Sequence, residues 1–393
     1  MGKRVGVVLG AAIAVLLTST LALGWTGRGL APGLNSGRPP FKAQLLPPRD
    51  AKPTQAPSLA ASATSTPMAT PTSTATPTPA SQPTAPPAPR PTPPPPAMPC
   101  SIAFGMYQSN APWSWGQINS IESQINRHSA IVHWYAQWGN QSGVFNPTEL
   151  NMLNAVRQHG SLSLITWEPW VGPPATNNPY PLKSIAAGQF DAYVDSWAAG
   201  LKAFGHPVML RWGPEMQGNW LPWGANINGN TPADYIAAYR HVHDRFAKAG
   251  VRNVQWVFGA DGDPNGGFPP LGNFYPGDAY VDWLGSDIYN VGTTQQYGTW
   301  QPMSARLQLS YSRLTALNAT KPIVLAEFGS VEQGGSKAAW VQQAAVDLPR
   351  LFPRVKAVVW FSEGIYSLTT SAAAITGERA AFGSAPFCLT LPY

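Results

Sequence analysis

Two short stretches of this 393-residue chain combine carboxylates with side chains that suit acid–base chemistry. The first, LRWGPEMQGNWLPWG at 210–224, surrounds Glu215 with one arginine and three tryptophans. The second, KPIVLAEFGS at 321–330, carries an apolar run that ends on Glu327. Two carboxylates facing one cleft can hydrolyse a glycosidic bond, because one donates a proton while the other stays ionised and attacks the anomeric carbon.

Other side chains near these glutamates fit the same chemistry. Arg211 lies four residues before Glu215, and a guanidinium beside Glu327 would keep that carboxylate ionised. Tyr289 could donate a hydrogen bond to the nucleophile, and Glu168 either binds a sugar hydroxyl or caps a loop. Flat apolar faces for sugar rings are expected from Trp212, Trp220, Trp223 and Trp360.

Each of these assignments has a structural alternative. Glu215 could be a surface-loop acid, and Glu327 could pair with Arg211 for structure alone. Trp212 is open to a role in the barrel core, and Trp256 is favoured as a core residue. Four further acids near strand ends are ambiguous, the first three favoured as loop acids over substrate contacts: Asp261, Asp263, Asp287 and Glu363.

The elements that must position these residues alternate between strands and helices. Apolar runs predict eight strands, at 101–107, 131–138, 162–168, 207–212, 254–260, 281–289, 322–328 and 355–361. Amphipathic stretches predict helices between them, including 147–160, 190–205, 231–250 and 336–352, the third with a threonine N-cap and a proline in its first turn.

This alternation predicts a parallel sheet, and eight strands in about 290 residues predict a (β/α)8 TIM barrel. The alternative is a doubly wound open sheet. It is weakened because FGMYQSNAPWSWG, after the first strand, is aromatic and lacks a glycine-rich phosphate loop. Chemistry in barrels lies at the carboxyl ends of the strands. Glu215 follows the fourth strand and Glu327 closes the seventh, so both should reach one mouth.

The N-terminal quarter differs in composition from the rest. Residues 1–24 are two cations followed by an apolar run, which predicts a secretory signal peptide, with an uncleaved membrane anchor as the alternative. Residues 25–99 are rich in Pro, Thr and Ala and predict a disordered linker. The catalytic domain is expected at 100–393, secreted or held at the cell surface.

Charge and cysteine content limit the other possibilities. The first 99 residues hold eight of the basic residues and one acid, so the net charge of +6 belongs to that segment and no nucleic-acid surface is expected. Two cysteines bracket the predicted domain, and Cys100 and Cys388 are expected to form a disulfide outside the cytoplasm. The six scattered histidines are read as structural, and we expect no metal, no cofactor and a monomer.

Together the two motifs resemble glycoside hydrolase family 26, the β-mannanase-type family of the retaining (β/α)8 clan. The family pattern R-x-x-H-E-M-N-G-x-W-x-P-W-G is matched at Arg211, Glu215, Met216, Gly218, Trp220, Pro222, Trp223 and Gly224. The second motif matches at Glu327, Phe328 and Gly329. The resemblance covers about residues 101–375. It implies Glu215 as acid/base, Glu327 as nucleophile, and Trp360 under the cleaved sugar.

Two departures from the family pattern leave the polysaccharide open. Pro214 stands where the family has histidine, and Gln217 where it has asparagine. A proline ring has no donor and cannot bind a sugar hydroxyl, although it stiffens the approach to Glu215. We expect an exported endo-β-1,4-mannanase. The alternatives are a β-1,3-1,4-glucanase or other endoglucanase of the family, or a catalytically silent carbohydrate-binding protein.

Overall fold

The computed structural model describes residues 100–140, 144–262, 269–295, 298–383 and 386–388. The predicted signal peptide or anchor at 1–24, the predicted linker at 25–99 and Asp263 lie outside the described residues. Within the described part of the chain, no helix combines the length and apolarity that crossing a membrane requires.

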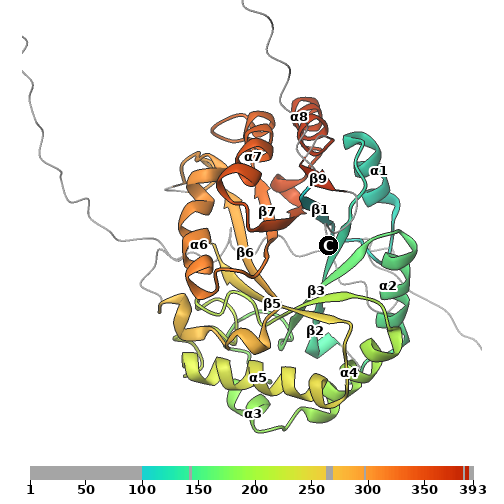
Figure 1. Ribbon diagram of the computed structural model, residues 1–393, viewed down its shortest axis with the longest axis vertical. Coiled ribbons are helices and arrows are strands. Elements are labelled where there is room, and N and C mark those ends of the chain that lie inside the picture. Colours follow the sequence, from blue (N-terminus) through green and yellow to red (C-terminus); the bar gives the residue numbers. More distant parts are fainter. Residues whose placement is uncertain (1–99, 141–143, 263–268, 296–297, 384–385, 389–393) are drawn as a thin grey trace, which may run out of the picture. The chain divides into compact units, whose positions relative to one another are not determined.

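Eight parallel strands close into a barrel, as the alternation predicted (Figure 1). Neighbouring strands pair in chain order, and β1 pairs with both β2 and β8, which closes the sheet. The strands are β1 (Ile102–Tyr107), β2 (Ile131–Gln137), β3 (Leu162–Glu168), β4 (Val208–Trp212), β5 (Val254–Asp261), β6 (Trp283–Asn290), β7 (Ile323–Ser330) and β8 (Val355–Phe361).

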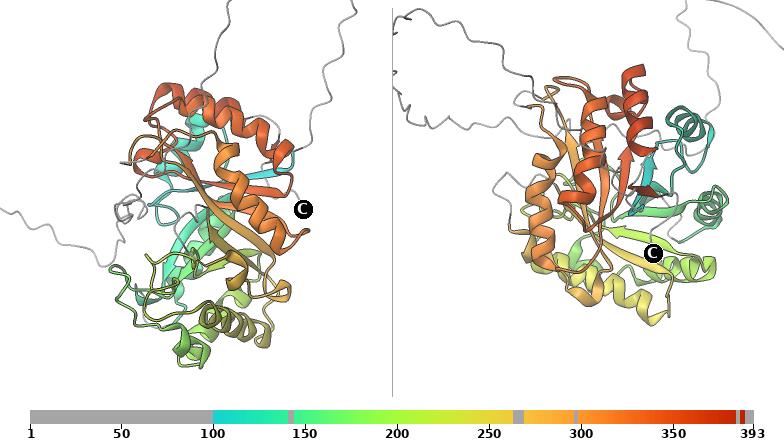
Figure 2. Two further views of the ribbon diagram at one scale, coloured as in Figure 1. Left: turned by 90° about the vertical axis from the view of Figure 1, so that its left-hand side faces the viewer. Right: turned by 45° about the horizontal axis from the view of Figure 1, so that its top comes forward.

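Helices surround the strands on the outside of the barrel (Figures 1 and 2). They are α1 (Gly116–Ile125), α2 (Pro147–Gln158), α3 (Leu182–Ala186), α4 (Asp191–Phe204), α5 (Pro232–Lys248), α6 (Met303–Leu317), α7 (Lys337–Leu351) and α8 (Ala372–Phe382). Two of them begin with a capping box and a proline in the first turn, at Asn146 for α2 and at the predicted Thr231 for α5.

Alternate residues of each strand face two different apolar layers. The barrel interior holds mostly small and branched side chains, namely Ala103, Ile131, Leu164, Met209, Val257, Trp283, Val324, Ala326, Ala357 and Val359. A larger cluster fills the space between strands and helices and takes up most of the buried tryptophans, including Trp256, for which a core position was predicted. The side chain's place in this alternation therefore decides whether a tryptophan can reach the barrel mouth.

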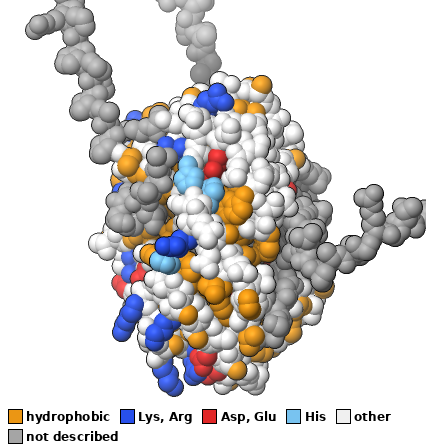
Figure 3. All heavy atoms as spheres, turned by 90° about the vertical axis from the view of Figure 1, so that its right-hand side faces the viewer, with side chains coloured by type: hydrophobic (Ala, Val, Ile, Leu, Met, Phe, Trp, Pro, Cys, Tyr) orange, Lys and Arg blue, Asp and Glu red, His pale blue; other side chains and the backbone are white. Residues whose placement is uncertain are grey.

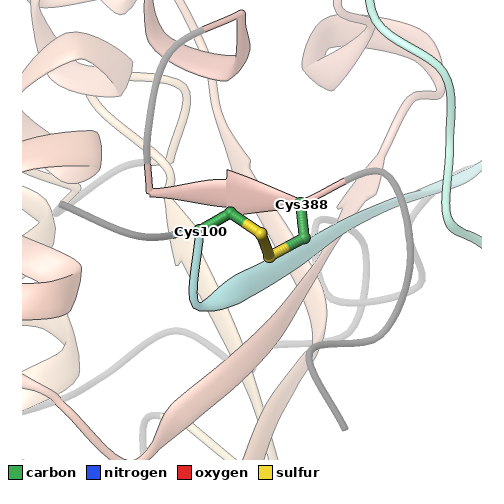
Figure 4. Close-up of a disulfide and its surroundings, with 2 residues drawn as sticks. All are labelled: Cys100 and Cys388. Atoms are coloured by element: carbon green, nitrogen blue, oxygen red, sulfur yellow. A yellow bond between two sulfur atoms is a disulfide. The ribbon is translucent and has the colours of Figure 1, made fainter. Parts of the chain in front are cut away.

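A disulfide joins the two ends of the described barrel, as predicted. The short strand β9 (Phe387–Cys388) pairs in parallel with β1, which brings Cys388 beside Cys100 (Figure 4). Their Cα atoms lie 5.0 Å apart, within the range that a disulfide spans, and the bond closes a sequence separation of 288 residues.

Removal of this disulfide should destabilise the folded chain. A Cys100→Ala/Cys388→Ala variant is expected to lose about 2–5 kcal/mol of unfolding free energy, because the unfolded chain regains the freedom that the long loop had lost. Urea unfolding measures the change. Reductant should lower the stability of the parent protein to that of the variant and leave the variant unaffected. Equal stability of variant and unreduced parent would contradict the expectation.

Candidate active site

A fully buried guanidinium lies at the centre of the barrel mouth. Arg211 on β4 donates from Nη2 to the carboxylate of Asp287 on β6, and from Nη1 to Oε1 of Glu327 on β7 at 2.9 Å. Burial alone would lower the pKa of Arg211, but the two carboxylates raise it above its ordinary value, so the group stays charged. The absence of a side chain at Gly259 makes room, since a Cβ there would lie 2.4 Å from Nε of Arg211.

Glu327 accepts three hydrogen bonds that favour its ionised form. In addition to Arg211, the hydroxyl of Tyr135 on β2 donates to Oε1 at 2.8 Å, and the hydroxyl of Tyr289 donates to Oε2 at 2.8 Å. Burial, followed by the charge of Glu327, raises the pKa of both tyrosines well above the usual value, so they remain donors. Donors on both oxygens hold this carboxylate charged and fixed in orientation.

A bulge in β7 aims Glu327 into the barrel. The register with β6 shifts between Ser286 and Asp287. Ser286 pairs with Leu325, but the next residue, Asp287, pairs with Glu327, so the pairing skips Ala326. Ala326 already faces the interior, and strict alternation would turn the next side chain outward. The extra residue re-aims the glutamate, as bulges beside active sites commonly do.

Glu215 lies on a tight turn after β4. Its backbone φ is +56°, in a region that L-residues with side chains rarely adopt, and Gly213 precedes it with φ of +50°. Two hydrogen bonds fix the turn: the Glu215 amide donates to the Gly259 carbonyl at 2.9 Å, and Trp223 Nε1 donates to the Pro214 carbonyl at 2.7 Å. Neighbouring structure therefore determines this costly conformation, a pattern found at functional sites.

The Glu215 side chain points toward the other carboxylates. Trp220 Nε1 donates to its Oε2 at 2.8 Å. One carboxylate oxygen from each of Glu215, Asp287 and Glu327 lies within 4.8 Å of the other two. The sequence thus correctly predicted that Glu215 and Glu327 meet at one mouth, although they come from strands on different sides of the barrel. Three such carboxylates could share a cation, but Arg211 already forms ion pairs with two of them, Asp287 and Glu327.

Two further buried polar pairs complete the surroundings. On β2, His133 Nε2 lies 2.7 Å from Thr166 Oγ1, to which Arg211 Nη1 also donates at 3.3 Å. Burial, as the largest cause, lowers the pKa of His133 to about 3, so its ring is neutral. Glu168, predicted as a third carboxylate near the mouth, is buried at the end of β3 and accepts from Gln137 Nε2 at 3.0 Å. Its contact with a sugar stays a prediction.

The predictions for Trp223 and Trp360 as sugar-binding surfaces are wrong. Trp360 is fully buried between barrel and helices, and its Nε1 donates to the Tyr366 carbonyl at 2.7 Å. Trp223 is 2% exposed and supports the Glu215 turn through Pro214. Trp212 is also fully buried in the outer layer, which leaves the half-buried Trp220 as the one of these four able to reach a ligand.

Sequence reasoning missed several residues of the site. Tyr135 lies on β2, which no sequence pattern connects with Glu327. Asp287, expected to be a loop acid, lies in β6 and binds Arg211. Aromatic rings at the mouth come instead from Tyr107 and Phe361, which stack with centroids 4.6 Å apart. Period-two alternation is the signal that could have found them, because Phe361 faces the interior when Trp360 faces out.

Comparison with known proteins adds family relationships. The family model described as Glycosyl hydrolase family 26 matches residues 176–340. Endoglucanase H of Acetivibrio thermocellus is 36% identical over 273 residues, which is 68% of this chain and 29% of that protein. A mannan endo-1,4-beta-mannosidase of Bacillus subtilis is 28% identical over 175 residues, covering 42% of this chain and 43% of that protein. The chain thus spans less than half the length of either relative.

Solved structures share the barrel. The catalytic domain of a Bacillus sp. JAMB-750 endo-beta-1,4-mannanase superimposes with a TM-score of 0.56 at 19% identity, covering 73% of this chain and 87% of that chain. At this level of identity the likeness shows the fold alone.

The neutral His133 should make the fold sensitive to acid. Its folded pKa of about 3 lies below the ordinary 6.5, so between these values only the unfolded chain binds the proton, and the free energy of unfolding falls as pH decreases. In a His133→Asn variant, the unfolding free energy should depend less steeply on pH, by up to about 1.4 kcal/mol per pH unit. Urea unfolding from pH 6.5 to 4 measures it. A matched His206→Asn variant at an exposed site should keep the parent slope, and an unchanged slope for His133→Asn would refute the interpretation.

Proposed function

Because the chain belongs to glycosyl hydrolase family 26, we propose that it is a retaining endo-β-glycosidase with Glu215 as acid/base and Glu327 as nucleophile. The observation that carries the proposal is the set of donors around Glu327, next to a second carboxylate. Glu327 accepts from one guanidinium and two tyrosine hydroxyls, and Glu215, which accepts from the indole of Trp220, has a carboxylate oxygen within 4.8 Å of it. Such a pair suits an ionised nucleophile beside an acid/base.

The distance between the carboxylates supports retention of configuration. Their nearest oxygens lie within 4.8 Å of each other, short of the ~6.5–9.5 Å separation that leaves room for an inverting water. In the first step Glu327 bonds to the anomeric carbon as the glycosidic C–O bond breaks, and Glu215 gives its proton to the departing oxygen. In the second step Glu215 takes a proton from water, whose oxygen displaces Glu327 from the anomeric carbon.

The substrate is proposed from the relatives, since Pro214 removes the family's histidine. The sequence alone favours β-1,4-mannan as the first candidate and β-glucan as the second. The longer and more similar match is to a protein named as an endoglucanase, at 36% identity over 68% of this chain. We therefore propose a β-linked glucan as the substrate and keep β-1,4-mannan as the second candidate, which the mannosidase relative favours.

Action outside the cytoplasm is part of the proposal. The disulfide between Cys100 and Cys388 is of a kind that forms and persists in oxidising compartments. Together with the predicted signal at 1–24, it supports an exported enzyme whose partner is a polysaccharide.

Substrates with different leaving groups should distinguish the roles of Glu215 and Glu327. A Glu327→Ala variant is expected to lose turnover on every substrate, because no covalent intermediate can form. A Glu215→Ala variant should lose about 10²–10⁴-fold in kcat/KM on polysaccharide, where the leaving oxygen needs a proton. The same variant should lose much less in the rate of the first step on an aryl glycoside with an acidic phenol, because that leaving group departs without a proton. The initial burst of released phenol measures this rate. An equal loss on both substrates would contradict the acid/base assignment.

A panel of polysaccharides should identify the sugar. Reducing-sugar release by the full chain is compared on barley β-glucan, galactomannan, glucomannan and β-1,3-xylan, with Glu327→Ala as the blank. We expect release from barley β-glucan. Release from the mannans alone would favour the second candidate and make Pro214 a tolerated variant. No release from any of them, with binding retained, would favour a carbohydrate-binding protein without activity.

A further inference from the structure

A cluster of two histidines and one glutamate lies at the opposite end of the strands from the carboxylates. Glu122 belongs to α1, His128 precedes β2, and His159 caps the C-terminus of α2 just before β3. Glu122 Oε2 lies 3.2 Å from His159 Nε2 and 3.6 Å from His128 Nδ1. One ligand atom from each of the three side chains lies within 4.8 Å of the other two. One carboxylate oxygen thus faces two imidazoles.

The hydrogen bonds around His159 determine which ring nitrogen carries a proton. Ser161 Oγ donates to the Ser129 carbonyl at 2.6 Å, so it must accept from His159 Nδ1, which lies 2.8 Å away. In the neutral ring the proton is therefore on Nδ1, and Nε2 presents a lone pair toward Glu122. Two lone pairs 3.2 Å apart repel unless a cation lies between them or the ring takes a second proton.

We propose that Glu122, His128 and His159 bind a divalent cation of the zinc class, with water in the fourth position. A tetrahedral ion with bonds of about 2.0–2.1 Å requires ligand atoms roughly 3.3 Å apart. The two measured separations, 3.2 and 3.6 Å, match this within the movement of one side chain. Imidazole and carboxylate together suit zinc, copper or nickel better than magnesium or calcium.

The surroundings prepare these side chains as ligands. Glu122 is positioned by the Ser129 amide, which donates to its Oε1 at 2.7 Å and leaves Oε2 facing the two imidazoles. The His159 ring stacks on Trp115 with centroids 4.3 Å apart, which fixes its orientation. Its Nδ1 hydrogen bond to Ser161 is the outer contact that a ligating histidine normally makes.

A single metal ion would contact both histidines at once, whereas a proton added to His159 Nε2 accounts only for the contact between that ring and Glu122. The rings of His128 and His159 lie 4.6 Å apart between centroids. The site is also reachable, since the His128 side chain is 34% exposed while those of Glu122 and His159 are 12% and 13% exposed. Figure 3, which faces the side of α1 and α2, shows histidine side chains beside an acidic one on this surface.

A cation here would tie together the segments that lead into β2 and β3. It would bind the folded chain and not the unfolded one, so the melting temperature should rise with metal concentration. The full chain, freed of metal with a chelator, is titrated with zinc chloride at pH 7.5 against a chromophoric zinc indicator, and its melting temperature is recorded. We expect one equivalent of zinc to bind and the melting temperature to rise, with no response to magnesium or calcium.

Variants locate the binding. His159→Ala and the more exposed His128→Ala should each abolish stoichiometric binding and the rise in melting temperature. Ser161→Ala, which removes the outer contact, should weaken binding by about 10–100-fold. The matched control is His241→Ala, because His241 faces Asp191 at 2.6 Å with no second histidine in the cluster, and it should bind zinc like the parent.

Two outcomes would overturn the proposal. The first is that the parent chain takes zinc from the indicator no better than the His159→Ala variant does. The second is stoichiometric binding that survives in both His128→Ala and His159→Ala. Either result would leave the cluster as a hydrogen-bonded histidine–carboxylate group, and neither would affect the proposed glycosidase, whose carboxylates lie at the other end of the barrel.

Discussion

The buried charge of Arg211 is the constraint on which the barrel mouth depends. A guanidinium without solvent contact must be balanced, and it binds Asp287 on β6 and Glu327 on β7 from its own place on β4. Loss of one partner in such a group typically costs several kcal/mol, because an uncompensated buried charge remains. Gly259 on the intervening strand leaves space for the side chain. The ion pairs therefore join β4, β6 and β7 and fix the carboxylate proposed as nucleophile.

Glu215, the second carboxylate, is positioned by its backbone conformation. Glu215 belongs to a loop, and its place is determined by a left-handed backbone conformation that hydrogen bonds to Gly259 and Pro214 maintain. Gly259 thus serves both carboxylates, since its carbonyl binds the Glu215 amide and its missing side chain admits Arg211. Pro214, a departure from the family pattern, accepts the Trp223 hydrogen bond through its backbone carbonyl, which a residue of any type at this position could supply.

Much of the architecture could be read from local sequence patterns. The eight strands, the N-cap of α5, the disulfide and the meeting of the two glutamates follow from periodicity, capping residues and the order of elements. The side-chain directions at strand ends could not all be read in this way. Trp360 was placed by motif position, whereas alternation turns it outward, and the β7 bulge that turns Glu327 inward leaves no local sign in the sequence.

Contacts between distant segments were also beyond the sequence. Tyr135 and Glu327 are 192 residues apart, and no local pattern connects them. The histidines gave the same difficulty: they look scattered in the chain, and the expectation of no metal rested on that spacing. Folding places His128 and His159 at equivalent positions before adjacent parallel strands, which is how two separated residues come to share Glu122.

The most direct test of the account is to trap the intermediate. The full chain is incubated with a 2-deoxy-2-fluoro β-glycoside of the sugar that the polysaccharide assay identifies, bearing an acidic phenol, and its peptides are analysed by mass spectrometry. The account predicts one added glycosyl group on the peptide that contains Glu327, and none in Glu327→Ala. A label on Glu215 or Asp287, or hydrolysis that inverts the anomeric configuration, would contradict it.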